Sequence, residues 1–520
     1  MKRLYCNGSI ITMRSPEKYD YLIAENGIIK HVGKGEAPTG KFEVIDLKGM
    51  TVMPAFIDSH SHFAAVADST MQCRLDKAYS FDDIVRQIRS FICDNGIKPG
   101  EWVRASGYDH NQLAEGTHPD RRLLDKICPD NPLAVSHASG HMGAFNSAAL
   151  KLLGVNELTA PPEGGKFGYT DGSLNGYMEE NAFVEYLKKV PMGSIEDYMH
   201  AFEKAQDKYA SCGITTVQEG MLANELCPLY QALIRSGRLR LDVIGYADYG
   251  NADGIYSRLG GAFRHFRLGG IKIFLDGSPQ GRTAYMLEPY EGENEYRGYP
   301  VMSDGDVISA MEYAADRNIQ LLAHCNGDAA AEQFLRCAEK TSEKIPVIRS
   351  LRFVMIHAQF VRPSQLDRVK RLGIIPSFFT AHSYYWGDTH IKNFGFERAS
   401  GMSPAKSALE KGVPFTFHQD SPVIEPDMIE TVRCAAERVT KCGIRLERES
   451  IPVFEALKAV TINAAYQYGE EKYKGTLEDG KNEDIVILDK NPMGQDISRF
   501  DDISIAATVK SGETVFQAEL

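Results

Sequence analysis

The stretch VMPAFIDSHSHF, residues 52–63, sets two histidines directly after a run of apolar residues. The apolar run from Thr51 to Ile57 has the length and composition of a buried β-strand. Alternate residues of an extended chain point to the same side, so we expect His60 and His62 to present both imidazoles to one ion. The stretch therefore predicts a strand that ends at a metal site.

Further apolar runs of strand length follow, separated by helical stretches, and this alternation predicts a parallel β/α architecture. Together with the first run they supply eight strands, so the predicted fold class is α/β, a TIM-like (β/α)8 barrel. The further runs are Thr215–Gln218, Leu241–Tyr246, Gly270–Leu275, Gln320–Ala323, Phe353–Ile356, Ile374–Phe379 and Pro414–Phe417.

Both ends of the chain alternate and turn like small β-units, for example at Leu4–Ile11 and Ile503–Val509. They predict a small β-sandwich domain formed from both termini. The segment between the first and second barrel strands is too long for a simple crossover and predicts a large insertion over the active site. The expected boundaries are 1–52 and 470–520 for the β-sandwich, 53–469 for the barrel and 63–212 for the insertion.

Polar residues follow several of the apolar runs. His324 lies in LLAHCNGD, His357 in VMIHAQF and Asp420 in FTFHQDSPV. Barrels of this type collect their catalytic groups at the carboxyl ends of the strands. With His60 and His62, four imidazoles and a carboxylate are therefore expected on one rim, which is the kind of convergent ligand set that a metal site needs.

Lys272, in GIKIFLDGS, is expected to point into the barrel beneath this rim. Burial disfavours a charged amine and lowers its pKa. The neutral amine can react with carbon dioxide to give a carbamate whose two oxygens bridge two cations. The alternative is that Lys272 pairs with Asp276 or another acid.

The composition is that of a globular protein, with 43% hydrophobic and 25% charged residues. The net charge of -12 and the lack of a basic run disfavour nucleic acid as a partner. The ten cysteines form no CxxC pair, the N-terminus has no apolar export signal, and no apolar run approaches the ~20 residues that span a bilayer. We therefore expect a cytoplasmic protein that does not enter membranes and acts on a small molecule.

The sequence resembles the YtcJ-like and N-substituted formamide deformylase-like metal-dependent hydrolases of amidohydrolase family 3, in the amidohydrolase superfamily. The resemblance covers nearly the whole chain. Besides the stretches quoted above, it rests on GYDHNQLAEGTHPDRRLLD (107–125), HASGHMGAFNSAAL (137–150), GIKIFLDGSPQGRTA (270–284), HQDSPV (418–423) and GTLEDGKNEDIVILDKNP (475–492).

The resemblance implies one or two divalent ions per chain, expected to be zinc. In a two-ion site His60 and His62 hold one ion with Asp420, and His324 and His357 hold the second. Lys272 matches the position that is carbamylated in many members of the superfamily, with carbon dioxide or bicarbonate as the source; Glu219 and Glu180 are the alternative bridging ligands. Asp420 is the expected general base and acid for hydrolysis of an amide-like or formamide-like C–N bond.

The resemblance also implies that Tyr108, His137 and His141 of the insertion face the substrate, although they could instead satisfy the insertion's own backbone. Arg282 either meets a substrate carboxylate or anchors the loop after its strand. His382 and Trp386 are either a substrate wall or rim packing.

Two other functions remain open. One is a deaminase-type hydrolase of a heterocycle, which in this superfamily typically runs on one metal and does not need the lysine. The other is a catalytically inactive regulatory protein, for which a degenerate ligand set would be expected. Enzymes of this architecture often form dimers, so a homodimer is also an expectation.

Overall fold

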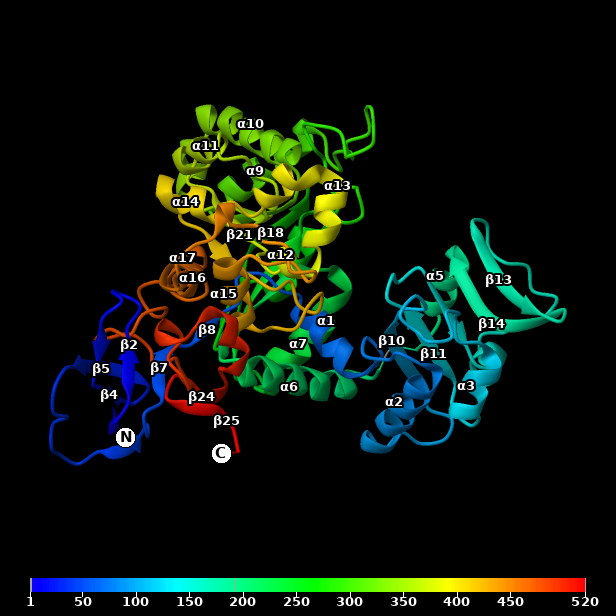
Figure 1. Ribbon diagram of the computed structural model, residues 1–520, viewed down its shortest axis with the longest axis horizontal. Coiled ribbons are helices and arrows are strands. Elements are labelled where there is room, and N and C mark those ends of the chain that lie inside the picture. Colours follow the sequence, from blue (N-terminus) through cyan, green and yellow to red (C-terminus); the bar gives the residue numbers. More distant parts are fainter. Residues whose placement is uncertain (1, 192, 520) are drawn as a thin grey trace. The chain divides into compact units, whose positions relative to one another are not determined.

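The computed structural model describes residues 2–191 and 193–519, and the chain divides into two compact units (Figure 1). One unit comprises Met1–Ala65 with Phe202–Leu520, and the other comprises Val66–Ala201. Helices α1 (Phe63–Thr70) and α6 (Ile195–Ser211) each contain one of the two boundaries between the units.

A parallel sheet of eight strands forms the centre of the first unit, in the order β22-β21-β20-β19-β18-β16-β15-β8. The α/β, TIM-like fold class is confirmed. A short strand, β17 (Ala262–Phe263), adds to β18 in the antiparallel sense. The barrel strands are β8 (Phe56–Ile57), β15 (Ile214–Leu222), β16 (Asp242–Asp248), β18 (Phe266–Phe274), β19 (Gln320–Cys325), β20 (Val354–His357), β21 (Ile375–Phe378) and β22 (Thr416–Phe417).

The first predicted barrel strand, Thr51–Ile57, is wrong in one respect because it divides between two sheets. Residues Thr51–Pro54 form β7, which pairs with β23 (Ile485–Leu488) in a terminal sheet, and only β8 joins the barrel. The backbone hydrogen bonds show where the division falls. The N–H of Ala55 donates to the carbonyl of Asp484, beside the terminal sheet, whereas the N–H of Phe56 donates to the carbonyl of Gly213, beside the barrel strand β15. An apolar run alone does not tell which partner strand each half will find.

Hydrogen bonds beyond the strand ends join β8 to β22, which share no ladder among the described residues. The hydroxyl of Ser59 donates to the carbonyl of Phe417 at 2.8 Å. The backbone N–H of Asp420 donates to His60 at 3.2 Å, and that of His62 donates to Ser421 at 2.9 Å. These bonds hold the segment of His60 and His62 directly against the segment of Asp420.

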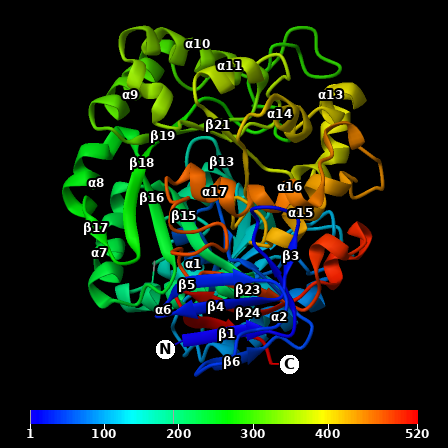
Figure 2. The same ribbon diagram turned by 90° about the vertical axis from the view of Figure 1, so that its left-hand side faces the viewer.

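Helices surround the barrel strands, and Figure 2 shows α7, α8 and α9 outside β16 and β18. Apolar side chains such as Ile244, Leu322 and Ile356 are buried in the barrel core. The helices after β15 are α7 (Cys227–Ser236), α8 (Ala252–Leu259), α9 (Asp304–Asp316), α10 (Asp328–Lys344), α11 (Leu366–Arg371), α12 (His382–Tyr385), α13 (Gly387–Ser400), α14 (Ala405–Lys411), α15 (Met428–Glu437), α16 (Val453–Ala459) and α17 (Ile462–Gln467).

The two ends of the chain build two further sheets, in the orders β5-β4-β1-β6 and β25-β24-β23-β7-β2-β3. A shared core that includes Tyr5, Leu22, Val52, Ile485 and Val509 packs between them. Figures 1 and 2 both show the N- and C-termini in this region. The strands are β1 (Lys2–Cys6), β2 (Ser9–Ile11), β3 (Lys18–Tyr19), β4 (Tyr21–Glu25), β5 (Ile28–Gly33), β6 (Glu43–Asp46), β24 (Ile505–Lys510) and β25 (Glu513–Gln517), besides β7 and β23.

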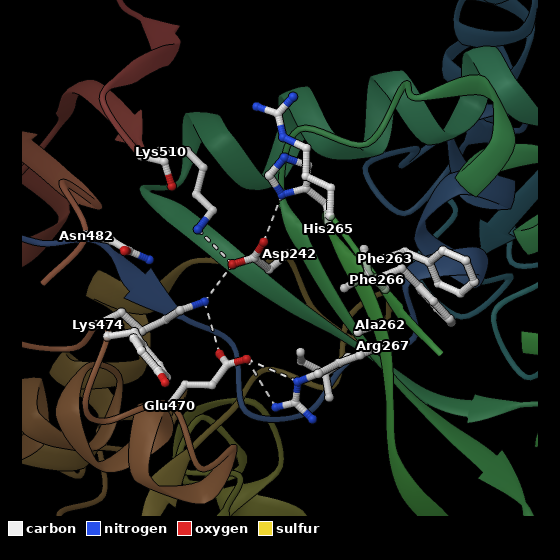
Figure 3. A pocket seen from close by; sticks show the side chains of 15 residues that line it. Asp242, Ala262, Phe263, His265, Phe266, Arg267, Glu470, Lys474, Asn482 and Lys510 are labelled. Carbon is white, nitrogen blue, oxygen red and sulfur yellow. Dashed lines mark hydrogen bonds and ion pairs between the residues drawn. The ribbon is translucent and has the colours of Figure 1, made fainter. Parts of the chain in front are cut away.

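An ion-pair network ties the terminal sheets to the barrel around a pocket of about 400 Å³ (Figure 3). Asp242, at the start of β16, lies 2.6 Å from Lys474 and 2.7 Å from Lys510 of β24. His265 and Glu470 extend the network. Burial raises the pKa of Asp242, but the two lysines outweigh burial and hold that pKa well below its ordinary value.

The second unit lies within the segment 63–212 that the sequence predicts to be an insertion, and it is built on a sheet in the order β13-β14-β12-β11-β10-β9 with its own apolar clusters. No helix in the described part of the chain is both long and apolar enough to cross a lipid bilayer. The insertion's strands and helices are β9 (Cys73–Arg74), α2 (Phe81–Asp94), β10 (Val103–Tyr108), α3 (Arg121–Ile127), β11 (Leu133–His137), β12 (Met142–Phe145), α4 (Ser147–Leu152), β13 (Gly165–Thr170), β14 (Ser173–Glu180) and α5 (Asn181–Leu187).

Candidate metal centre

The expected ligands come from the carboxyl ends of the barrel strands. His60 and His62 follow β8, Lys272 lies in β18, His324 is in β19 and His357 ends β20. Asp420 follows β22. His357 and Asp420 have positive φ angles of 72° and 54°, which are uncommon for residues other than glycine. Such backbone conformations concentrate at functional sites, where the surrounding structure holds them in place.

His60, His62 and Asp420 form the tightest group. The Nε2 atoms of both histidines lie 3.4 Å from the same carboxylate oxygen, Oδ1 of Asp420. No hydrogen-bond donor satisfies this buried oxygen within the described residues. Two ligands of a tetrahedral zinc ion at about 2.1 Å lie roughly 3.4 Å apart, so the spacing of these atoms fits a shared ion.

Gln218 of β15 fixes the tautomer of His60. Its side-chain nitrogen donates to the carbonyl of Ser59 at 2.8 Å and to the hydroxyl of Tyr468 at 2.9 Å. Its oxygen must therefore accept from Nδ1–H of His60, at 2.6 Å. This leaves Nε2 of His60 without a proton of its own, with its lone pair facing the carboxylate of Asp420 and Nζ of Lys272 3.5 Å away. The two electron-rich atoms repel each other unless a cation lies between them.

His324 and His357 lie beside this group, with ring centroids 4.7 Å apart. Nε2 of His357 is 4.0 Å from Oδ2 of Asp420. Nε2 of His324 accepts from the side-chain amide of Asn326 at 3.3 Å, and its buried Nδ1 lies 3.4 Å from Oδ1 of Asp276. The ring of His357 also lies 5.6 Å from that of His60, so the two histidines extend the cluster.

Lys272 is buried beneath the histidines, with its Nζ 3.5 Å from Nε2 of His60. Burial lowers the pKa of this amine to about 7, with the charge of Asp420 opposing the shift. The alternative partner, Asp276, instead accepts from the backbone N–H groups of Asn326 and Gly327. Lys272 has no ion pair with any residue that the structure describes.

The ionisable groups of the site have pKa values that burial and neighbouring charges shift in different directions. Burial lowers the pKa of His62, but the adjacent carboxylate of Asp420 outweighs burial and raises that pKa overall. Burial also raises the pKa of Asp420, and its contacts with His62 outweigh this to give a net lowering. Burial takes the pKa of His60 and of His357 well below the ordinary histidine value. Asp420 is thus anionic at neutral pH, with neutral imidazoles on two sides.

The two alternative bridging ligands differ sharply. Glu219 of β15 is buried, with Oε1 3.9 Å from Nδ1 of His62, and its other oxygen accepts from the N–H of Ala64 and the hydroxyl of Tyr230. Burial raises its pKa. Glu180 lies in the insertion with 58% of its side chain exposed and contacts His141.

The candidate substrate residues of the insertion form a cluster within their own unit. Nε2 of His137 lies 3.2 Å from Nδ1 of His110 and 3.5 Å from Asp109, an arrangement that could hold a metal ion. However, the N–H of Ser139 donates to Nδ1 of His137, which places the imidazole proton on Nε2. Tyr108 contacts His118. The substrate-facing role of Tyr108, His137 and His141 stays a prediction.

The remaining candidates pack against protein groups. Arg282 pairs with Glu293 at 3.0 Å, a contact that favours the loop-anchoring alternative. His382 is buried, bonds to His390 at 3.0 Å and packs against Trp386 with ring centroids 4.5 Å apart. These contacts favour rim packing for His382 and Trp386.

Sequence reasoning missed two residues that hold the ligands, Gln218 and His418. His418 is fully buried, and its Nε2 lies 3.1 Å from Nδ1 of His357. Burial lowers the pKa of His418 to about 3, so it is neutral. A signal was present in HQDSPV, where His418 and Asp420 alternate along the chain. Gln218 carries no such signal.

Comparison with known proteins agrees with this geometry. Residues 43–516 match the model of a family described as the amidohydrolase family. The YtcJ protein of Bacillus subtilis is 26% identical over 99% of this chain and 100% of its own length. N-substituted formamide deformylase of Arthrobacter pascens is 27% identical over 90% of this chain and 89% of its own length.

A solved structure shows the same architecture. The crystal structure of an uncharacterized metal-dependent hydrolase from Pyrococcus furiosus is 26% identical, with a TM-score of 0.77. The match covers 95% of this chain and 100% of that chain. Because the family model spans most of the sequence and the barrel is also shared, this chain belongs to the amidohydrolase family.

Proposed function

We propose that this protein is a metal-dependent hydrolase that cleaves an amide-like or formamide-like C–N bond of a small molecule. The observation that carries the proposal is the bare Nε2 of His60, 3.4 Å from a carboxylate oxygen of Asp420 that no donor satisfies within the described residues. Nε2 of His62 lies at the same distance from that oxygen. A divalent cation, which we propose to be zinc, would replace the repulsion between His60 and Asp420 with coordination by all three side chains.

We assign a second ion to His324 and His357, with a carbamate on Lys272 as the bridge. A pKa of about 7 leaves about half of the Lys272 amine neutral at pH 7. The nitrogen attacks carbon dioxide, a new C–N bond forms, and one proton is released to solvent. The resulting anion replaces a buried amine with two ligand oxygens, and no competing acid pairs with Lys272 among the described residues.

The proposed chemistry follows from these groups. A divalent ion held by these residues would supply Lewis-acid chemistry, because it would lower the pKa of a bound water to about 7 and polarise a carbonyl oxygen. Asp420 is anionic and keeps 14% of its side chain exposed, so it can accept the proton of that water. The same carboxyl then gives the proton to the leaving amine. Glu219, locked by Ala64 and Tyr230, limits the movement of His62.

The relatives support the substrate class. One full-length relative is named for deformylation of N-substituted formamides, and a solved relative is described as a metal-dependent hydrolase. We therefore expect N-substituted formamides and simple N-acyl amines to be the first substrates to test. Phe274 packs against His324 and Phe379 packs against His357, so the surroundings of the two histidines are partly apolar.

The experiment measures release of free amine from a panel of N-substituted formamides and N-acyl amines. Chelator-treated protein should be inactive, and zinc should restore the rate. Asp420→Asn should remain about 10²–10⁴-fold slower than wild type after zinc is restored. Hydrolysis of the whole panel by metal-free protein would contradict the proposal.

One observation favours a second candidate, a mononuclear deaminase-type hydrolase. In the described part of the barrel, His60, His62 and Asp420 form the one group whose ligand atoms all lie within 4.8 Å of one another. Ammonia release from amino-substituted heterocycles, with one zinc per chain and no effect of Lys272→Ala on zinc content, would select this candidate.

A further inference from the structure

A line of buried hydrogen-bonding groups runs beneath the metal centre and crosses several barrel strands. Nδ1 of His357 contacts Nε2 of His418 at 3.1 Å, and Nδ1 of His418 contacts Oγ of Ser377 at 2.9 Å. Oγ of Ser377 contacts Oγ of Ser59 at 3.0 Å, and Oγ of Ser59 contacts the carbonyl of Phe417 at 2.8 Å. All four side chains are buried.

The direction of this line follows from counting protons, starting at Phe417. A carbonyl can only accept, so the single hydroxyl proton of Ser59 goes to Phe417. The contact between the two serines must then carry the proton of Ser377. Ser377 therefore accepts from Nδ1–H of His418, which leaves Nε2 of His418 without a proton. That nitrogen accepts from Nδ1–H of His357.

The opposite direction leaves one contact without a proton. If Ser377 donates to His418, neither serine has a proton for the contact between them, because the hydroxyl of Ser59 already donates to the carbonyl of Phe417. The two serine oxygens then face each other with lone pairs only. His418 would then donate to His357, whose proton would move to Nε2. A buried contact between unprotonated acceptors is unfavourable, so the first direction is the stable one.

We propose that Ser59, Ser377 and His418 are positioning residues that fix His357 in the tautomer with a bare Nε2 aimed at the metal centre. The inference rests on the proposed metal-dependent function. Groups that hold a ligand histidine by its second nitrogen typically change metal affinity by about 10–100-fold when removed. The three side chains are fully buried and act through His357.

The tautomer of the other ligand histidine, His60, is fixed by a glutamine, and this contact suggests a rescue variant. The amide oxygen of Gln218 accepts from Nδ1–H of His60 at 2.6 Å. Glutamine is similar to histidine in reach and offers an acceptor oxygen. His418→Gln should therefore keep the tautomer of His357, whereas His418→Leu removes the acceptor.

The experiment compares zinc and cobalt affinity, by competition with a chromophoric chelator, in wild type, Ser377→Ala, His418→Leu and His418→Gln. Ser383→Ala is the matched control, because Ser383 is a buried serine whose hydroxyl donates to the carbonyl of Thr380 outside the line. We expect affinity to fall about 10–100-fold in Ser377→Ala and His418→Leu, and to stay within about threefold of wild type in the other two. The absorption spectrum of bound cobalt should change in the two weakened variants.

Imidazole ¹⁵N spectra of metal-free wild type report the tautomer of His357 directly. A variant is needed only to assign the His357 signal. We expect a protonated Nδ1 and an unprotonated Nε2 at His357. The reverse tautomer, or unchanged affinity in both Ser377→Ala and His418→Leu, overturns the inference. A wild type that binds neither ion overturns the proposed function itself, so the two failures are distinguishable.

Discussion

Replacing Lys272 with methionine separates the stability of the fold from the function of the site. Lys272 is buried, has no ion pair within the described residues, and is held at a pKa of about 7 by burial. Methionine has a similar length and no charge to desolvate. The metal-free variant should therefore be more stable than metal-free wild type at pH 7, although it cannot form the proposed carbamate.

The magnitude follows from the pKa. A shift from 10.5 to about 7 corresponds to about 5 kcal/mol, which is the upper limit of the gain. Between pH 7 and 10.5 the unfolded chain binds more protons at Lys272 than the folded chain, so wild type gains stability as pH rises. Lys272→Met lacks this gain. Its advantage should be full at pH 7 or below and should shrink at pH 9.

The assay is the midpoint of thermal unfolding of chelator-treated proteins at pH 7 and pH 9, at one scan rate. Lys474→Met is the matched control, because Lys474 is equally buried but lies 2.6 Å from Asp242 and 3.0 Å from Glu470. Breaking such a buried pair costs about 3–5 kcal/mol, so this variant should unfold at a lower temperature. A midpoint for Lys272→Met at or below that of wild type at pH 7 would refute the reasoning.

Three further predictions concern the site, the loop after β18 and the ion-pair network. Asp420→Asn should lower kcat by about 10²–10⁴-fold because it removes the group that moves the proton, whereas Asp253→Asn on an exposed surface should not; steady-state kinetics with an active formamide measures both. Arg282→Ala should leave KM within about twofold of wild type, because Arg282 is paired with Glu293, and a larger rise would indicate contact with a substrate carboxylate. Asp242→Asn should unfold at a lower temperature than wild type at pH 7, and the difference should shrink as pH falls below about 4, because a carboxyl with a lowered pKa loses its contribution as it is protonated; an undiminished difference at pH 3 would contradict this.

The sequence predicts the barrel because parallel strands leave a regular trace of apolar runs that are followed by polar residues. It also indicates where His60, Lys272 and Asp420 lie, since each follows or occupies such a run. The division of Thr51–Ile57 between β7 and β8 depends on partner strands far away in sequence. No local pattern encodes it.

The contacts that Gln218 and His418 make with the ligands could not be predicted for the same reason, although the spacing of His418 and Asp420 in HQDSPV marks His418 as a candidate. Gln218 is a polar residue within β15 and His418 directly follows β22, and only the packing of neighbouring strands brings them to His60 and His357. Glu180 illustrates the converse, because its residue type suits a ligand while the structure leaves it largely exposed beside His141. Residue type and local spacing identify candidate ligands, and the three-dimensional contacts determine their tautomers.

The most direct test of the metal-dependent function is elemental analysis of protein purified without chelator and with bicarbonate present. Wild type should contain about two zinc ions per chain, falling in Lys272→Ala, and His60→Asn/His62→Asn should lose the ion shared with Asp420. His31→Asn, on the exposed face of β5, should retain the wild-type content. Wild type without bound metal, or a double variant that keeps the full wild-type content, would contradict the account.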